Sequence, residues 1–175
     1  FLWISTSDGL QKYDGVRFYK IKPSETDPTA LLSDRQCYLF KDGHDNIWIS
    51  HNRGLSCFIR DKGQFKNVFV FREPLSENLL EGLQKIGEDQ QKNIWLFTAK
   101  SGFYYLDTKQ LKIRATGNRF MNLTFDLSKT IFSELQPDGT CLMNANGNLL
   151  HVDLKKQQLI REYKNFIPPV TNLFR

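Results

Sequence analysis

The sequence lacks several features that mark particular classes of protein. Its three cysteines, Cys37, Cys57 and Cys141, stand far apart with no CxxC pair and no histidine at metal-ligand distance, which favours buried free thiols. No apolar run approaches the roughly eighteen residues that a membrane-spanning helix needs, so we expect no direct membrane insertion by this segment. A basic tract is also missing despite a net charge of +5. Scattered basic side chains favour solvated strand faces, permit an acidic ligand and predict no nucleic-acid partner.

The chain begins at Phe1 without an initiator methionine or a signal peptide, inside an expected strand. We therefore expect an excerpt of a longer protein. Aromatic residues, in contrast, are abundant at 13% of the chain. Flat side chains pack well on pleated surfaces, so this composition favours an all-β fold.

A short strand pattern centred on tryptophan recurs along the chain. Residues 1–6 (FLWIST) return as residues 46–51 (NIWISH) and 93–98 (NIWLFT), with a decayed fourth copy at residues 140–144 (TCLMN). Trp48 follows Trp3 by 45 positions and Trp95 follows Trp48 by 47. Self-similarity at this period is typical of repeat architectures.

A second landmark keeps the same register, because a glycine with an apolar residue follows each copy. The pairs are Gly9 with Leu10, Gly54 with Leu55, Gly102 with Phe103, and Gly147 with Leu149. Turn-forming residues separate four strand candidates per unit, near 36–41, 46–50, 54–59 and 64–71 in the second unit. Tight turns of this kind predict antiparallel pairing.

Four-stranded meanders repeated about every 47 residues are what propeller blades require, since a lone meander cannot bury both faces. We predict an all-β fold, a β-propeller fragment of about four four-stranded antiparallel meander blades. The predicted repeat units are approximately 1–35, 36–82, 83–129 and 130–175, the first and last incomplete. Trp3, Trp48 and Trp95 are expected in the core between blades; a ligand-stacking platform is the alternative.

Residues 2–15 (LWISTSDGLQKYDG) resemble the two-component regulator propeller repeat, and residues 42–50 (DGHDNIWIS) resemble the entry to the same repeat. The chain departs from that pattern at Ser5, Ser50 and Phe97, which stand where the family has glycine, and the fourth copy has lost its tryptophan.

The resemblance implies the periplasmic sensor region of a hybrid two-component system histidine kinase of Bacteroidetes. It further implies a glycan or glycan breakdown product as ligand and a homodimeric receptor. The positive charge of the chain permits an acidic ligand, and because 175 residues make fewer than four full units, we expect further blades of the parent chain to complete the propeller. Nothing in these residues matches the kinase itself, so we expect this segment to bind and not to catalyse.

Residues with catalytic chemistry are present but not grouped in a known pattern. His44, His51 and His151 have no serine or cysteine partner at a suggestive spacing, and no metal motif or cofactor motif occurs. Turn carboxylates such as those of Asp42, Asp45 and Asp89 are explained by turn formation and loop solvation. We therefore expect no catalytic residue, no metal site and no cofactor.

Binding in a propeller belongs to the loops at one end of the blades, since the strands are committed to packing. If the strand near Gln36 is innermost, the loops leading into it share a face with those before each Gly-Leu pair. The candidate ligand-contact residues on that face, which ordinary loop solvation also explains, are Asp34, Arg35, His51, Asn52, Arg53 and Lys100.

The chemistry of the ligand decides which side chains would serve. Arg35, Arg53 and Lys100 suit the sulfate or carboxylate groups of an acidic glycan. A neutral sugar would need stacking aromatics such as Tyr104 or Tyr105.

The sequence leaves two other functions open. A protein-interaction scaffold propeller of the WD or kelch type is the first, although the chain lacks the Trp-Asp dipeptide and the double glycine. A propeller lyase or glycosidase is the second, and it would need clustered carboxylates facing the channel.

Overall fold

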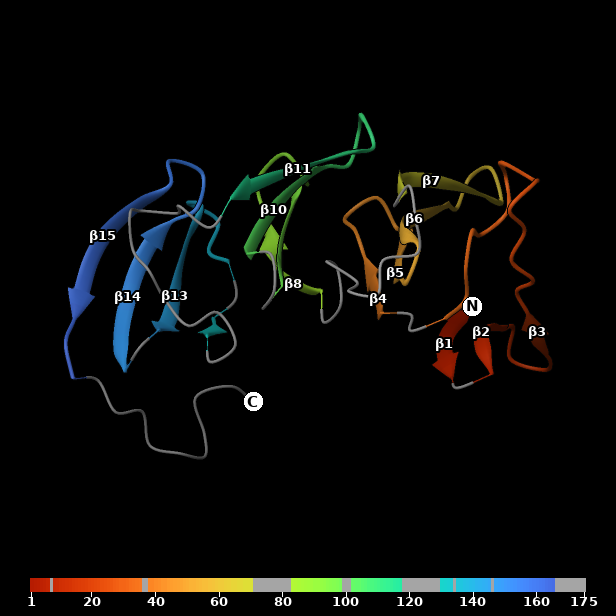
Figure 1. Ribbon diagram of the computed structural model, residues 1–175, viewed down its shortest axis with the longest axis horizontal. Helices are drawn as coiled ribbons and strands as arrows, with labels where there is room; N and C mark the ends of the chain where they lie inside the picture. The colour runs from red at the N-terminus through yellow and green to blue at the C-terminus, as the bar shows by residue number, and fades with distance from the viewer. Residues whose placement is uncertain are drawn as a thin grey trace. The chain divides into compact units, whose positions relative to one another are not determined.

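A computed structural model describes residues 1–6, 8–35, 38–70, 83–98, 102–117, 130–133, 135–145 and 147–165. Every regular element within these residues is a β-strand (Figure 1). The strands form four antiparallel sheets, and neighbours in each sheet are consecutive in sequence. This up-and-down order is the meander of a propeller blade, so the predicted all-β β-propeller fragment is confirmed.

The described residues divide into two compact units, one within Phe1–Leu83 and Asp107–Ile113, the other within Gln84–Leu106 and Arg114–Arg175. The first two sheets comprise β1 (Leu2–Thr6), β2 (Gly9–Tyr13) and β3 (Phe18–Lys20), then β4 (Tyr38–Lys41), β5 (Ile47–His51), β6 (Gly54–Ile59) and β7 (Gln64–Val70).

The third sheet contains β8 (Gln84–Glu88), β9 (Ile94–Thr98), β10 (Gly102–Asp107) and β11 (Lys112–Gly117). The fourth contains β12 (Ile131–Phe132), β13 (Thr140–Ala145), β14 (Asn148–Asp153) and β15 (Gln158–Tyr163). The exact limits of the repeat units stay a prediction.

The Gly-Leu landmark marks a tight turn, between β1 and β2 in the first sheet and between β5 and β6 in the second. Gly9 lies opposite Thr6 and Gly54 opposite His51, each directly across the hairpin. Both glycines have positive φ, 110° and 139°, a backbone conformation that side chains disfavour. A Cβ atom at Gly9 would also collide with the carboxylate of Asp34. Glycine at this position therefore serves the turn and, in the first blade, the close approach of a loop.

Aromatic packing joins the first two sheets. The Trp3 ring from β1 lies 4.8 Å from the Phe58 ring and 6.2 Å from the Phe65 ring, centroid to centroid. Leu10 of β2 is fully buried in the same cluster. Leu31, from the segment between β3 and β4, is fully buried there as well. The segment before β4 is therefore anchored in the core although its described residues form no strand.

The third and fourth sheets share a second core. Trp95 and Phe97 of β9 cluster with Cys141 and Met143 of β13, and the Phe97 ring lies 4.5 Å from that of Phe132. Trp3 and Trp95 thus occupy the interblade core that their repeat position predicts.

Trp48 and the described cysteines are also interior. Trp48 is fully buried and stacks on Phe40 of the adjacent strand, with ring centroids 6.2 Å apart. Cys57 and Cys141 are buried free thiols, as expected, and burial raises the pKa of each to about 12. Cys37 lies outside the described residues.

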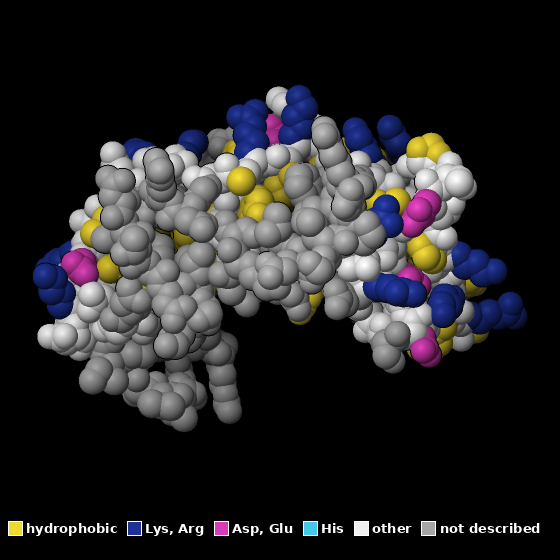
Figure 2. All heavy atoms as spheres, in the orientation of Figure 1, with side chains coloured by type: hydrophobic (Ala, Val, Ile, Leu, Met, Phe, Trp, Pro, Cys, Tyr) yellow, Lys and Arg dark blue, Asp and Glu magenta, His cyan; other side chains and the backbone are white. Residues whose placement is uncertain are grey.

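The described surface carries its charges in separate groups. On the face drawn in Figure 2, Lys and Arg side chains stand at several places with Asp or Glu side chains among them. In the part of the chain that the structure describes, no helix is long and apolar enough to cross a membrane.

Candidate ligand-binding site

A pocket of about 420 Å³ lies in the first unit. Its walls come from the segment between β3 and β4, through residues 23–25 and 32–35, and from the turn between β5 and β6, through Asn52 and Arg53. Four of the six residues predicted from sequence line it: Asp34, Arg35, Asn52 and Arg53. Lys100 lies outside the described residues.

Hydrogen bonds hold the two walls together. The backbone N–H of Asn52 donates to the carbonyl of Arg35 at 3.2 Å, and the Ser33 hydroxyl donates to Asn52 Oδ1 at 2.7 Å. Ser33 also accepts from the backbone N–H of Arg35 at 3.3 Å. The expectation that these two loops share one face is met by these contacts.

The far side of the same segment is fixed to the sheets. The Ser24 N–H donates to the Leu31 carbonyl at 2.9 Å, which closes the segment on itself. The Phe65 N–H of β7 donates to the Thr29 carbonyl at 2.9 Å. Because Leu31 is fully buried in the core, the backbone of this wall is preformed.

Charged groups of both signs face the pocket. The Arg53 guanidinium donates from Nη1 to Glu25 Oε1 at 3.0 Å, with side-chain exposures of 24% and 68%. Arg53 Nε is buried and has no hydrogen-bond partner in the described part of the chain. The Asp34 carboxylate makes no hydrogen bond or ion pair with any described residue. The lining of the pocket thus includes two arginines, Arg35 and Arg53, and two acidic residues, Glu25 and Asp34. The Arg53 guanidinium and the Asp34 carboxylate keep unused hydrogen-bonding capacity toward the described residues.

His51 has no exposed surface and, among the described residues that line the pocket, it hydrogen-bonds to the backbone of Arg53. The Arg53 backbone N–H donates to His51 Nδ1 at 3.1 Å, so Nδ1 carries no proton and Nε2–H donates to Ser56 Oγ at 2.8 Å. Ser56 Oγ donates in turn to Asn67 Oδ1 at 2.5 Å. Burial first, and then the nearby Arg53 charge, lower the pKa of His51 to about 4. A neutral His51 therefore positions the backbone of Arg53 and does not face the pocket.

The structure pairs His51 with Ser56, a partner that no suggestive sequence spacing had indicated. The sequence signal was weak, because a spacing of five residues across a hairpin has no characteristic pattern. The pair is nevertheless not arranged for nucleophilic catalysis. Nε2 already carries the proton, so it cannot take one from Ser56, and both side chains have no exposed surface that a substrate could reach.

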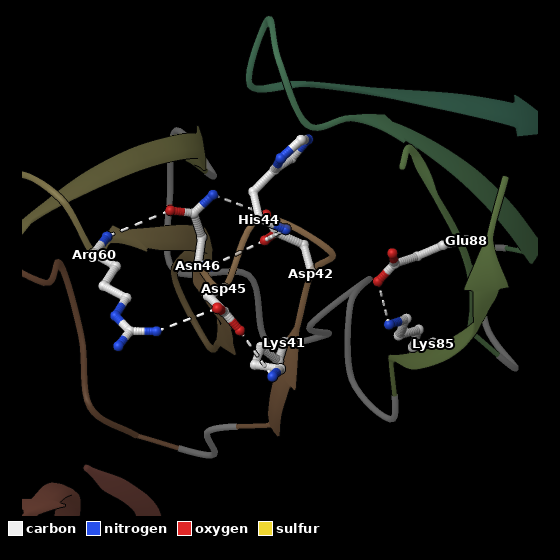
Figure 3. A network of polar contacts seen from close by, with 8 residues as sticks. All are labelled: Lys41, Asp42, His44, Asp45, Asn46, Arg60, Lys85 and Glu88. Carbon is white, nitrogen blue, oxygen red and sulfur yellow. Dashed lines mark hydrogen bonds and ion pairs between the residues drawn. The ribbon is translucent and has the colours of Figure 1, made fainter. Parts of the chain in front are cut away.

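The turn before β5 contains a buried carboxylate that sequence reasoning misjudged. Asp42 is only 1% exposed, so loop solvation does not explain it, whereas its role in turn formation is correct. It accepts hydrogen bonds from the backbone N–H groups of His44 and Asn46, both at 2.9 Å, and from Asn46 Nδ2 at 3.0 Å (Figure 3). Trp48 Nε1 adds a fourth at 2.8 Å.

The third blade repeats this arrangement. Asp89 accepts from the backbone N–H groups of Gln91 and Asn93, both at 2.9 Å, and from the Tyr105 hydroxyl at 3.1 Å. The spacing of Asp, then Asn four positions later and Trp six positions later, is the sequence signal that would have revealed the pattern. These carboxylates hold the turn and the aromatic core.

The aromatic side chains considered for a neutral sugar are already engaged. Tyr104 is 8% exposed and therefore buried. Tyr105 packs on Trp95 at 5.1 Å between ring centroids and bonds to Asp89. Among the described residues, no group of three or more His, Cys, Asp or Glu side chains is arranged to hold a metal ion.

Solved structures resemble this chain, but no family model and no curated protein matches it. The extracellular domain of a hybrid two-component system from B. thetaiotaomicron is similar with a TM-score of 0.63 and 21% sequence identity, covering 90% of this chain and 22% of that one. The extracellular domain of a one-component system from the same organism has a TM-score of 0.60 and 18% identity, covering 93% and 22%. The chain thus spans about a fifth of each, and the likeness supports the fold.

Proposed function

We propose that this chain is part of the extracytoplasmic, periplasmic ligand-sensing propeller of a hybrid two-component signalling receptor, and that the pocket beside Asp34 and Arg53 holds the ligand. The ligand is a glycan or a glycan breakdown product. Further blades of the parent chain complete the propeller, and the receptor acts as a homodimer. The segment binds and does not catalyse.

The preformed pocket carries this proposal. Its walls come from two loops joined by hydrogen bonds. The charged and amide groups that line it have hydrogen-bonding capacity left to bind the hydroxyl groups of a sugar. The fold likeness to extracellular domains of bacterial signalling systems supports the same assignment.

Thermal denaturation of the whole protein in the presence of an oligosaccharide library tests the proposal. A ligand that binds only the folded state at a hundred times its Kd stabilises the protein by about 2.7 kcal/mol. Asp34→Asn, which removes the charge with little change of volume, should reduce that stabilisation. Asp61→Asn, an equal charge change in the exposed turn between β6 and β7, should leave it intact.

Failure would take a clear form. If no oligosaccharide stabilises the whole protein, while a protein partner co-purifies with it and depends on these loops, the interaction-scaffold alternative replaces the sensor assignment. Equal loss of stabilisation in both Asn variants would move the ligand site away from the pocket.

A further inference from the structure

We infer that Arg53 binds a carboxylate or sulfate group of the ligand. The Glu25 carboxylate occupies the same position on Arg53 until the ligand displaces it. This inference rests on the proposed function and adds the charge class of the ligand and a competing side chain. It follows from the hydrogen-bonding state of Arg53, the exposure of Glu25 and the position of Asp34.

Arg53 is presented in a fixed place with donors to spare. Its backbone N–H is held by buried His51, and only 24% of its side chain is exposed. A guanidinium offers donors in a planar fork that matches two oxygens of a carboxylate or sulfate. Within the described residues, Arg53 Nη1 donates to Glu25, whereas Nε is buried and has no acceptor. A buried donor without a partner is destabilising, so an anion that lets the guanidinium turn and pair Nε recovers stability.

Glu25 is the group that is easiest to displace. Its side chain is 68% exposed, and exposed ion pairs contribute little to stability. The backbone beside it is held by the Ser24–Leu31 hydrogen bond and by burial of Leu31. Displacement therefore needs a rotation of one solvated side chain and no movement of the loop.

Asp34 restricts which anions can bind to Arg53. Its unpaired carboxylate lines the same pocket as Arg53, so it repels a second negative charge and accepts hydrogen bonds from hydroxyl groups. A ligand with one anionic group beside several hydroxyls satisfies both residues. The pocket therefore favours a sugar acid or a singly sulfated sugar over inorganic sulfate or a densely charged polymer.

Calorimetric titration of the whole protein with matched pairs of oligosaccharides tests the inference. Each pair has an acidic member with a single anionic group and a neutral member made by methyl esterification or desulfation, for example a disaccharide of one uronic acid and one neutral sugar and its methyl ester; inorganic sulfate is the free-anion probe. We expect tighter binding of the acidic member and no measurable binding of sulfate. Raising the salt concentration should weaken only the acidic member.

Variants distinguish the competing role of Glu25 from the binding role of Arg53. Glu25→Gln should tighten binding of the acidic member about two- to fivefold, since it removes a weak exposed ion pair, and should leave the neutral member unchanged. Arg53→Gln should weaken the acidic member roughly ten- to a hundredfold, because a hydrogen bond to a charged group is lost. Arg53→Lys keeps the positive charge but not the planar fork of donors, so it should weaken binding of the acidic member less than Arg53→Gln does.

The chain provides a matched control in another exposed ion pair. Arg60 Nη1 lies 3.2 Å from Asp45 Oδ2, with side-chain exposures of 67% and 52% (Figure 3). Arg60→Gln and Asp45→Asn repeat the same charge changes outside the pocket and should not alter binding of either member.

Each remaining result has a definite meaning. Equal binding of acidic and neutral members, or acidic binding that Arg53→Gln leaves unchanged, overturns the inference while the sensing function stands. Weaker binding of the acidic member after Glu25→Gln also overturns it, because removing a side chain that competes with the ligand for Arg53 cannot weaken binding of the ligand. Absence of binding by every oligosaccharide overturns the inference and the proposed function together. Tighter binding cannot arise from misfolding, so the Glu25 variant remains informative in all cases.

Discussion

Removal of the Asp42 carboxylate should destabilise the second blade far more than other changes in the same turn. Asp42 is 1% exposed and accepts from four donors, one of which is the indole of fully buried Trp48. In Asp42→Ala the Trp48 Nε1–H has no acceptor and no access to water, which costs about 1–3 kcal/mol. Loss of the turn hydrogen bonds adds roughly 0.5–1.5 kcal/mol, since His44 is exposed and water replaces part of them.

The expected total is therefore about 1.5–4.5 kcal/mol of unfolding free energy, lost without any change at the pocket. Urea unfolding followed by tryptophan fluorescence and by circular dichroism measures it. Asp45→Asn is the control, because Asp45 is exposed in the same turn and asparagine tolerates its positive φ of 63°. If Asp42→Ala is no less stable than Asp45→Asn, the carboxylate does not hold the indole and the account of this turn is wrong.

Three further changes probe other parts of the structure. Folding lowers the pKa of His51 from 6.5 to about 4, so the unfolded chain binds the proton more tightly than the folded one. The free energy of unfolding therefore decreases by up to about 3 kcal/mol as pH falls from 6.5 to about 4. His51→Gln should flatten that part of the stability–pH curve. Gly9→Ala should destabilise by more than 1 kcal/mol, on the order expected for strain at positive φ, because it also meets Asp34. Buried Cys57 and Cys141 should react with a thiol reagent only as fast as the protein unfolds.

Each of these outcomes has a clear opposite. A stability curve between pH 4 and 6.5 that His51→Gln leaves equally steep would assign the titration to another group. A Gly9→Ala protein as stable as the parent would mean that the loop carrying Asp34 can withdraw at no cost. Rapid labelling of Cys57 in native buffer would show that the second sheet opens far more readily than its burial indicates.

The repeated pattern was sufficient to predict the blades, because it is local. Trp3, Trp48 and the Gly-Leu pairs recur at nearly constant intervals of 45 to 48 residues, and strand alternation and turn chemistry act over a few residues. The strands at Ile47–His51 and Gly54–Ile59 lie within a residue or so of their predicted limits. The interblade position of Trp3 followed from the same periodicity.

What the sequence did not reveal depends on contacts between segments far apart in the chain. Leu31 reads as a loop residue in a polar stretch, yet it is buried because the segment folds back over the first two sheets. The Glu25–Arg53 ion pair spans 28 residues. The shared face of Asp34 and Asn52 was predicted from blade topology alone. That His51 lies beneath this face and not on it follows from its pairing with Ser56, which no local pattern indicates.

A crystal structure of the whole protein with the oligosaccharide that stabilises it most would test the central claim directly. We predict ligand density in the pocket, with its acidic group on the Arg53 guanidinium, hydroxyl groups within hydrogen-bonding distance of Asp34 or Asn52, and Glu25 turned toward solvent. Density for the same oligosaccharide at another face of the propeller, with Glu25 still paired to Arg53, would contradict the account.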